Sequence, residues 1–116
     1  MNFMLLIHQG TTPVPPSREW DALSEQERSA IGDAYRKISE TPGVSPGMRM
    51  QSPASATTVR VRDGRTMTTD GPFAETKEAL GGYLFFEAAD LDSAIELASL
   101  IPAARIGGAV EVRPLA

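Results

Sequence analysis

Alternating apolar positions predict β-strands at both ends of the chain. Residues 2–8 are apolar on both faces of an extended segment up to the final histidine, which indicates a strand buried on both sides. Residues 82–88 have the same character, with four bulky apolar side chains in succession. In residues 109–113, two valines alternate with a glutamate and an arginine, which is typical of a strand with one buried face.

An apolar period of three to four residues predicts two helices between these strands. Ser24 and Glu27 form a capping-box pattern, so the first helix is expected over residues 24–40. Its apolar stripe consists of Ile31, Ala34, Tyr35 and Ile38. Asp90 is the expected N-cap of the second helix, and Pro102 is expected to end it.

An Asp-Gly pair at residues 63–64 predicts a β-hairpin. Such a pair favours the type I′ turn of a two-residue hairpin, because both of its central residues need a positive φ. The two β-rich runs that it joins are residues 57–62 and 65–69. In this register Arg62 faces Arg65 and Arg60 faces Met67, which makes the tip basic. The tip is either a solvated end or a contact surface for a partner.

The order of these elements, β-α-β, hairpin, β-α-β, predicts an α+β fold. A short strand at residues 48–51 is expected to complete the second β position. Without the hairpin this is the ferredoxin-like split βαβ pattern, an antiparallel sheet with two helices on one face. The strands at residues 2–8 and 82–88 are apolar on both faces, so the uncovered face is expected to pack on a second copy. We therefore predict a single domain, residues 1–116, that forms a dimeric α/β barrel as a homodimer.

The composition of the chain excludes several kinds of catalytic and metal-binding site. The chain has 116 residues, no cysteine, one histidine and a net charge of −4 at pH 7. These counts leave no disulfide, no thiolate nucleophile and no two-His metal cage, so we expect no metal and no cofactor. The acidic balance argues against nucleic-acid binding, because nucleic-acid binders usually carry a basic face. No apolar run approaches the roughly 18 residues of a membrane span, and residues 3–7 are too short for a signal peptide. We therefore expect a cytoplasmic protein.

A longer motif links the chain to a family. Residues 70–82 read Asp-Gly-Pro-Phe-Ala-Glu-Thr-Lys-Glu-Ala-Leu-Gly-Gly. This segment resembles the DGPF branch of the YCII-related (YciI-like) proteins. The resemblance extends over nearly the whole chain and includes residues 4–7, 57–65, 102–105 and 110–114. It implies a ferredoxin-like fold and a dimeric α/β barrel.

The resemblance also implies candidate activities. Some YCII-like relatives are linked to chloromuconolactone dehalogenation, and the fold is shared with muconolactone isomerases and cofactor-free monooxygenases. DGPF members are often encoded beside extracytoplasmic-function sigma factors, which implies a regulatory association. The broader family is thought to use a histidine on its first helix together with an aspartate. Residues 24–40 contain no histidine, so that role does not carry over, and His8 on the first strand is not its positional equivalent.

The DGPF segment has two interpretations. As a turn, Asp70 caps the following residues and Phe73 anchors the segment in the core. As a site, Glu75 and Glu78 share one face of a short helical turn over residues 74–79, with Lys77 beside them to shift their pKa values. The candidate catalytic groups in this segment are Asp70, Glu75 and Lys77, and the candidate ligand contacts are Phe73 and Glu78.

The remaining candidates lie near strand ends. Glu111 and Arg113 share the face opposite the two valines, where they either hold a ligand carboxylate or form a structural salt bridge. Arg105 either neutralises the end of the second helix or joins this ligand-binding group. His8 is either a hydrogen-bonded structural residue or a further candidate catalytic group, since histidine ordinarily titrates near neutral pH.

Two functions follow as hypotheses. The first is a homodimer that binds a small polar or lactone-like molecule in a cleft, with or without cofactor-free acid–base catalysis. Isomerisation and elimination are the reaction types that such residues favour, and the family resemblance adds dehalogenation. The alternative is a non-catalytic regulatory module associated with an extracytoplasmic-function sigma factor, with the basic hairpin as its contact surface.

Overall fold

The computed structural model describes residues 1–73 and 79–116. Its strands are β1 (Asn2–His8), β2 (Val44–Arg49), β3 (Thr57–Arg62), β4 (Arg65–Asp70), β5 (Leu80–Glu87) and β6 (Ala109–Pro114). Its helices are α1 (Arg18–Asp21), α2 (Glu25–Ser39), α3 (Leu91–Ser99) and α4 (Pro102–Arg105), with a short 3₁₀ turn at Pro53–Ser55. This composition confirms the α+β class.

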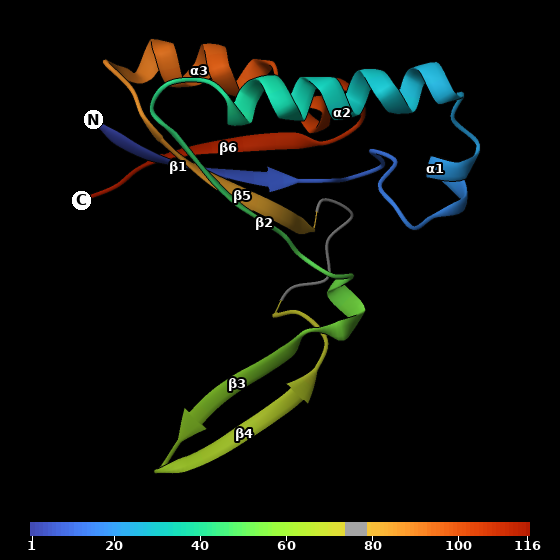
Figure 1. Ribbon diagram of the computed structural model, residues 1–116. Helices are drawn as coiled ribbons and strands as arrows, with labels where there is room; N and C mark the ends of the chain where they lie inside the picture. The colour runs from blue at the N-terminus through green and yellow to red at the C-terminus, as the bar shows by residue number, and fades with distance from the viewer. Residues whose placement is uncertain (74–78) are drawn as a thin grey trace.

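The described residues form two separate sheets. The larger has the order β2-β5-β1-β6, and every neighbouring pair in it is antiparallel. The smaller is the hairpin of β3 and β4. Figure 1 shows α2 and α3 on one face of the larger sheet, while the hairpin projects away on the opposite side. No closed barrel forms among the described residues of the single chain, so the dimeric barrel stays a prediction.

The core lies between the larger sheet and the helices. Phe3, Leu5 and Ile7 of β1 are buried there, and Phe3 and Leu5 have no exposed surface. They pack in one cluster with apolar side chains of β5, α2, α3 and the turn before α4, chiefly Leu84, Phe86, Ile38, Leu97 and Ile101. The intervening β1 residues are only half-buried. The prediction that β1 is buried on both sides is therefore not confirmed within one chain, because the helices cover only one face of the sheet.

Both predicted helix starts are confirmed. In α2, the Glu27 amide donates to Ser24 Oγ and the Ser24 amide donates to Glu27 Oε1, both at 3.0 Å. In α3, the Ser93 amide donates to Asp90 Oδ1 at 2.8 Å. Pro102 does not end α3 directly, because α3 stops at Ser99 and Pro102 begins α4. Proline fits that first helical position, where no amide donor is needed.

The strand after α2 differs from its prediction. Residues 48–51 were expected, whereas β2 spans Val44–Arg49 and includes Pro46 and Gly47. Proline is tolerated because β2 is an edge strand, and its ladder with β5 is irregular between Pro46 and Arg49. Glycine is required next, since a Cβ on Gly47 would lie 2.2 Å from the Tyr83 carbonyl oxygen. The pattern misled because proline and glycine usually mark loops.

The hairpin is confirmed in its turn and register. Asp63 and Gly64 have φ values of 51° and 73°, as a type I′ turn requires. Arg62 pairs with Arg65 and Arg60 pairs with Met67, and β4 extends one residue beyond its predicted end. The basic tip predicted from the sequence is therefore present.

The capping box gives a direct test of α2. Replacing Ser24 by alanine removes the acceptor of the Glu27 amide, so the free energy of unfolding is expected to fall by about 1 kcal/mol. Urea denaturation followed by circular dichroism measures the loss. The matched control is Ser29→Ala, within the same helix and exposed, which should change the value by less than about 0.5 kcal/mol. Equal effects of the two substitutions would contradict the capping role.

Candidate functional site

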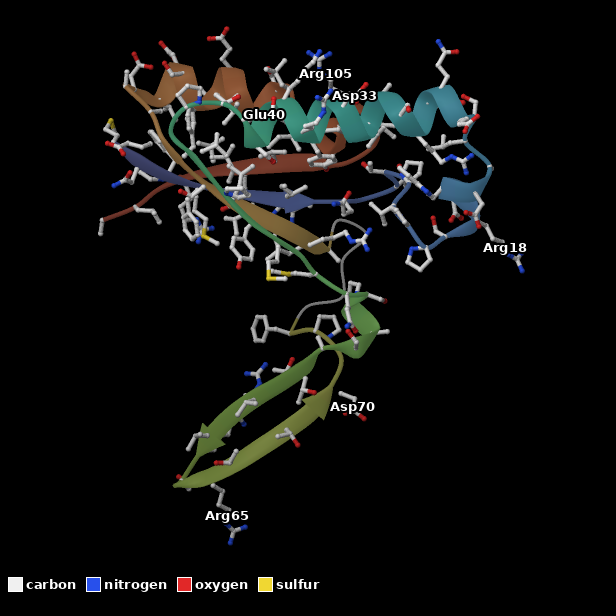
Figure 2. The ribbon with its side chains drawn as sticks, in the orientation of Figure 1. Arg18, Asp33, Glu40, Arg65, Asp70 and Arg105 are labelled. Atoms are coloured by element: carbon white, nitrogen blue, oxygen red, sulfur yellow. The ribbon has the colours of Figure 1, made fainter. Side chains whose placement is uncertain are left out.

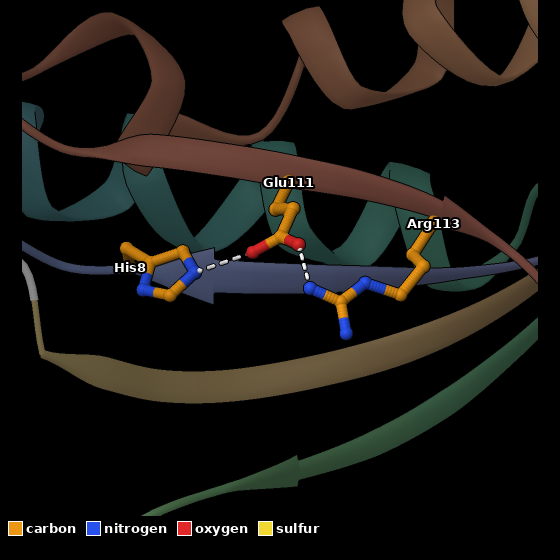
Figure 3. Close-up of polar contacts among 3 residues, drawn as sticks. All are labelled: His8, Glu111 and Arg113. Carbon is orange, nitrogen blue, oxygen red and sulfur yellow. Dashed lines mark hydrogen bonds and ion pairs between the residues drawn. The ribbon is translucent and has the colours of Figure 1, made fainter.

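Three of the predicted site residues meet on the sheet face away from the helices, called the open face below. His8 Nε2 lies 3.3 Å from Glu111 Oε1, and Glu111 Oε2 accepts a hydrogen bond from Arg113 Nη2. Figure 3 shows the glutamate between the imidazole and the guanidinium group. The structure thus brings His8, Glu111 and Arg113 into direct contact.

Strand register places these side chains on one face. Leu5 pairs with Val112, and both belong to the core side of the sheet. Side chains alternate along a strand, so Glu111, paired with Leu6, points to the open face. Arg113 and His8 lie two positions away on their strands and share that face. The predicted separation of the valines from the charged pair is confirmed.

The Glu111 carboxylate is held in its ionised form. The hydrogen bond from Arg113 lowers the pKa of Glu111 below the ordinary glutamate value, and the hydrogen bond with His8 lowers it further. Its side chain is 41% exposed, and that of Arg113 is 65% exposed. The arrangement therefore fixes the orientation of the imidazole and the guanidinium group at a solvent-accessible surface. It suits a structural ion pair and an anion contact equally.

The DGPF segment lies elsewhere. Asp70 ends β4 and is exposed at the base of the hairpin, as Figure 2 shows. The expectation that Phe73 anchors the segment in the core is wrong, because its side chain is 75% exposed. The base of the hairpin lies outside the helix–sheet core, and the Arg60 guanidinium carbon sits 4.9 Å from the Phe73 ring centroid instead. The turn is held by the Gly71 amide, which donates to the Ala56 carbonyl at 2.7 Å.

Three further candidates of this segment, Glu75, Lys77 and Glu78, lie outside the described residues. The same holds for all but the last residue of the short helical turn predicted over residues 74–79. Their roles as acid–base and ligand-binding groups stay predictions.

Arg105 has the first of its two predicted roles. Its Nε donates to the Ser99 carbonyl at 2.7 Å, so the guanidinium group lies at the C-terminal end of α3. Arg105 belongs to the helical layer (Figure 2), whereas the register of β6 places Glu111 and Arg113 on the open face. It also borders a groove of about 680 Å³ between α2 and α4, together with Lys37. It does not join the open-face group.

A cavity of about 320 Å³ lies between α2 and the edge of the sheet formed by β2 and β5. The loop at residues 12–15 and Trp20 of α1 contribute its remaining walls. Its lining is mainly apolar and includes Ile7, Val14, Ile31, Val44 and Met48. The cavity is therefore on the β5 and β2 side of β1 in the sheet, whereas Glu111 and Arg113 belong to β6 on its other side.

Four glycines are among the lining residues of the cavity. They are Gly32 of α2, Gly47 of β2, and Gly81 and Gly82 of β5. A Cβ on Gly32 would meet no atom within 4 Å. At Gly47 a Cβ would instead meet Tyr83, and at Gly81 it would meet the Gln9 side chain, so of these four only Gly32, at the exposed rim, leaves its position unoccupied.

Few polar groups reach this cavity, chiefly Gln9, Tyr35 and Arg49. Burial raises the pKa of Tyr35, and a hydrogen bond with the Gln9 side chain partly offsets that rise. The phenol is thus protonated at neutral pH and able to donate. Gln9 Oε1 is buried without a hydrogen-bond partner among the described residues. Arg49 Nη1 donates to the Pro15 carbonyl at 3.0 Å, which ties the loop to β2.

Sequence reasoning missed this cavity. The apolar stripe of the helix predicts Ile31 and Tyr35 in the core, whereas both line the cavity. The available signals were a tyrosine within that stripe and a proline-rich loop before it. Neither signal distinguishes a filled core from a cavity, because that difference depends on how α2 packs on the edge of the sheet.

Among residues 1–73 and 79–116, no group of three or more His, Asp or Glu side chains is arranged to hold a metal ion. Within the same ranges no helix is long and apolar enough to cross a membrane.

Comparison with known proteins supplies the family. The model of the YCII-related domain matches residues 1–116. The chain belongs to the YCII-related family. A relative from Rhizobium meliloti (strain 1021), an uncharacterised protein, is 40% identical over 101 residues. That match covers 86% of this chain and 79% of the relative. Membership of the YCII-related family, inferred above from residues 70–82 and four shorter stretches, is thereby confirmed.

The Glu111 cluster has a testable pH dependence. In Arg113→Gln the main hydrogen bond to the carboxylate is lost, so the pKa of Glu111 is expected to rise toward the ordinary value. A carboxyl-detected NMR titration measures it, and Arg62→Gln on the hairpin is the control that should leave it unchanged. Because the folded-state pKa lies below the unfolded one, the ion pair stabilises the fold above the unfolded pKa. That contribution is lost as pH falls through the folded value. A Glu111 pKa equal in all three proteins would contradict the arrangement.

Proposed function

We propose that this YCII-related protein binds a small molecule with an apolar body and a polar or anionic group in the cavity beneath α2. The observation that carries the proposal is the cavity itself. Its volume of about 320 Å³ falls at the lower end of the range of small-molecule sites, roughly 300–1,000 Å³. Such sites combine apolar walls with a few polar groups that orient the ligand, which is the lining found here.

The polar groups favour particular ligand chemistry. The protonated Tyr35 hydroxyl donates to a carbonyl oxygen, and Arg49 is suited to a carboxylate. Trp20 and Met48 offer apolar contact to a ring or short chain. A lactone or a small carboxylic acid matches this set, in agreement with the lactone chemistry that the family resemblance implies.

Cofactor-free acid–base catalysis at this cavity is the enzymatic form of the proposal. Tyr35 is a candidate general acid, because its half-buried phenol lines the cavity and carries a proton at neutral pH. The candidate carboxylates Glu75 and Glu78 precede Ala79, whose carbonyl accepts the Gln9 amide at 3.1 Å. Gln9 lines the cavity. Asp70 and Lys77 remain part of the candidate set, and the assignment to the DGPF branch belongs to the same proposal.

A homodimer is the second part of the proposal. Met4, Leu6 and Tyr83 on the open face are half-buried, and Phe85 is 39% exposed, so the face retains accessible apolar surface. A second copy packed sheet to sheet would cover it and generate a dimeric α/β barrel. The strand order β2-β5-β1-β6 supports the ferredoxin-like arrangement that such a barrel requires.

The alternative is a regulatory module in the cytoplasm that contacts an extracytoplasmic-function sigma factor. The feature that favours it is the exposed basic face of the hairpin, with Arg60, Arg62 and Arg65. This alternative needs no ligand in the cavity.

Blocking the cavity tests the first part. A panel of γ-lactones and small carboxylic acids is titrated against wild type, with binding followed by NMR chemical shifts. Gly32→Trp places an indole in the open space and is expected to weaken binding by at least about tenfold, or roughly 1.4 kcal/mol. Gly32→Ala is the matched control and should bind within about twofold of wild type, because its methyl group meets no atom.

Equal binding by both Gly32 variants would place the ligand outside the cavity. For any ligand that is turned over, Asp70→Ala and Glu75→Ala test the DGPF segment, and an unchanged rate in both removes it from the site. A wild type that binds no compound of the panel but is recovered with a sigma factor would support the regulatory alternative.

Light scattering tests the homodimer. Wild type is expected to have about twice the chain mass of 12.4 kDa. Leu6→Glu introduces a charge on the open face and should yield a folded monomer, with folding checked by circular dichroism. Ile95→Glu, on an α3 residue that is 50% exposed, is the control and should stay dimeric. A wild-type mass near 12.4 kDa would contradict the dimer.

A further inference from the structure

We propose that the β3–β4 hairpin is an arm that packs against a second copy of this chain through its uncharged face. The inference goes beyond ligand binding and rests on the proposed open-face homodimer. It gives a role to the hairpin, which contributes no residue to the cavity or to the helix–sheet core.

The hairpin has almost no packing of its own. Of residues Thr57–Asp70, only Thr58 is as much as half-buried. Val59 and Val61 are 58% and 65% exposed, and Met67 is 48% exposed. An isolated two-stranded hairpin is marginally stable in water, since it has no third strand or helix to pack on. Packing of these apolar side chains against another surface would therefore stabilise the hairpin.

The two faces of the hairpin differ in chemistry. Val59 pairs with Thr68 and Val61 with Thr66, so one face is uncharged and β-branched apart from Asp70 at its base. The other face carries Met67 and three arginines: Arg60, Arg62 and Arg65. β-branched side chains are the residues that pack well on a pleated surface. The uncharged face is thus the one suited to burial.

The position of the hairpin indicates that its partner is a second copy of the chain. It projects from the side of the larger sheet that faces away from α2 and α3, which is the side of the open face (Figure 1). Packed sheets lie about 10 Å apart, whereas a six-residue strand is roughly 20 Å long. A second copy seated on the open face would therefore lie alongside the hairpin, within its reach.

Charge also favours a second copy. Arg62 and Arg65 are directly paired, and like charges in that position repel each other. The three arginines exceed Asp63 and Asp70 by one charge, so a chain with a net charge of −4 carries −5 outside the hairpin. The positively charged arm of one copy is thus attracted at long range to the acidic body of the other, while its arginines stay on the solvent side of the contact.

The absence of cysteine makes a thiol-accessibility test possible. Val61→Cys and Met67→Cys each introduce the only thiol of the chain, on opposite faces of the hairpin. Both side chains are exposed in the single chain. Met67→Cys lies on the arginine face, which raises its thiolate fraction, so each variant is compared with itself in the Leu6→Glu background, which breaks the open-face dimer. A maleimide is expected to label Val61→Cys at least about tenfold more slowly in the wild-type background than in the Leu6→Glu background, and Met67→Cys at the same rate in both.

A second pair of variants tests the energy of the contact. Val61→Lys is expected to raise the dimer dissociation constant by more than about tenfold, because the contact would bury a charge. Met67→Lys, on the basic face, should change it by less than about twofold. Sedimentation measures both constants, and circular dichroism checks that each variant is folded.

The possible results of these experiments distinguish the proposed arm contact from the open-face dimer. A Val61→Cys labelling rate that is the same in both backgrounds, with a dimeric wild type, overturns the arm and leaves the open-face dimer standing. A monomeric wild type overturns both. Protection of Val61→Cys that persists in monomeric Leu6→Glu assigns the contact to the same chain, and protection that needs an added sigma factor assigns it to that protein. Either result overturns the arm.

Discussion

The burial of one face of β1 is the constraint on which the rest of the structure depends. β1 lies between β5 and β6, and its residues Phe3 and Leu5 are completely buried against the helices. A shift of one residue in its pairing would turn its whole apolar set to the other face. The same register therefore fixes the core on one side and the open face, with its ion pairs around Glu111, on the other.

The cavity depends on a second constraint, the lack of side chains where α2 faces the edge of the sheet. β2 approaches β5 so closely at Gly47 that no side chain fits. Gly32 on α2 adds none from the opposite wall. Tyr35 and Trp20 then border space instead of filling it. The close backbone approach at Gly47 fixes how β2 lies on β5, and the unoccupied position at Gly32 leaves space beside α2.

The larger sheet and the hairpin have different sources of stability. The sheet is held by the helix–sheet core, whereas nearly all side chains of the hairpin are accessible in the single chain. Its Asp63-Gly64 turn and cross-strand pairs determine its local shape. They do not supply a buried surface. A second copy on the open face would supply one, and it would relate the two exposed features of the molecule, the open face and the uncharged face of the hairpin.

The sequence alone determined the features that depend on near neighbours in the chain. The capping box at Ser24 and Glu27, the Asp-Gly turn, and the alternation in β1 and β6 each follow from residues a few positions apart. The family was also accessible, because the motif at residues 70–82 is long and specific. Asp33 likewise pairs with Arg36, three positions along the exposed surface of α2.

Only the tertiary structure decided which distant residues meet. It brought His8 to Glu111 across 103 positions of the chain, and it separated Arg105 and Asp70 from that pair. It left Phe73 exposed and β2 earlier than predicted. It also opened a cavity beside Tyr35. Hydrophobic patterns report which face of an element is apolar, but whether that face meets a side chain, a glycine or solvent depends on the packing of elements remote in the sequence.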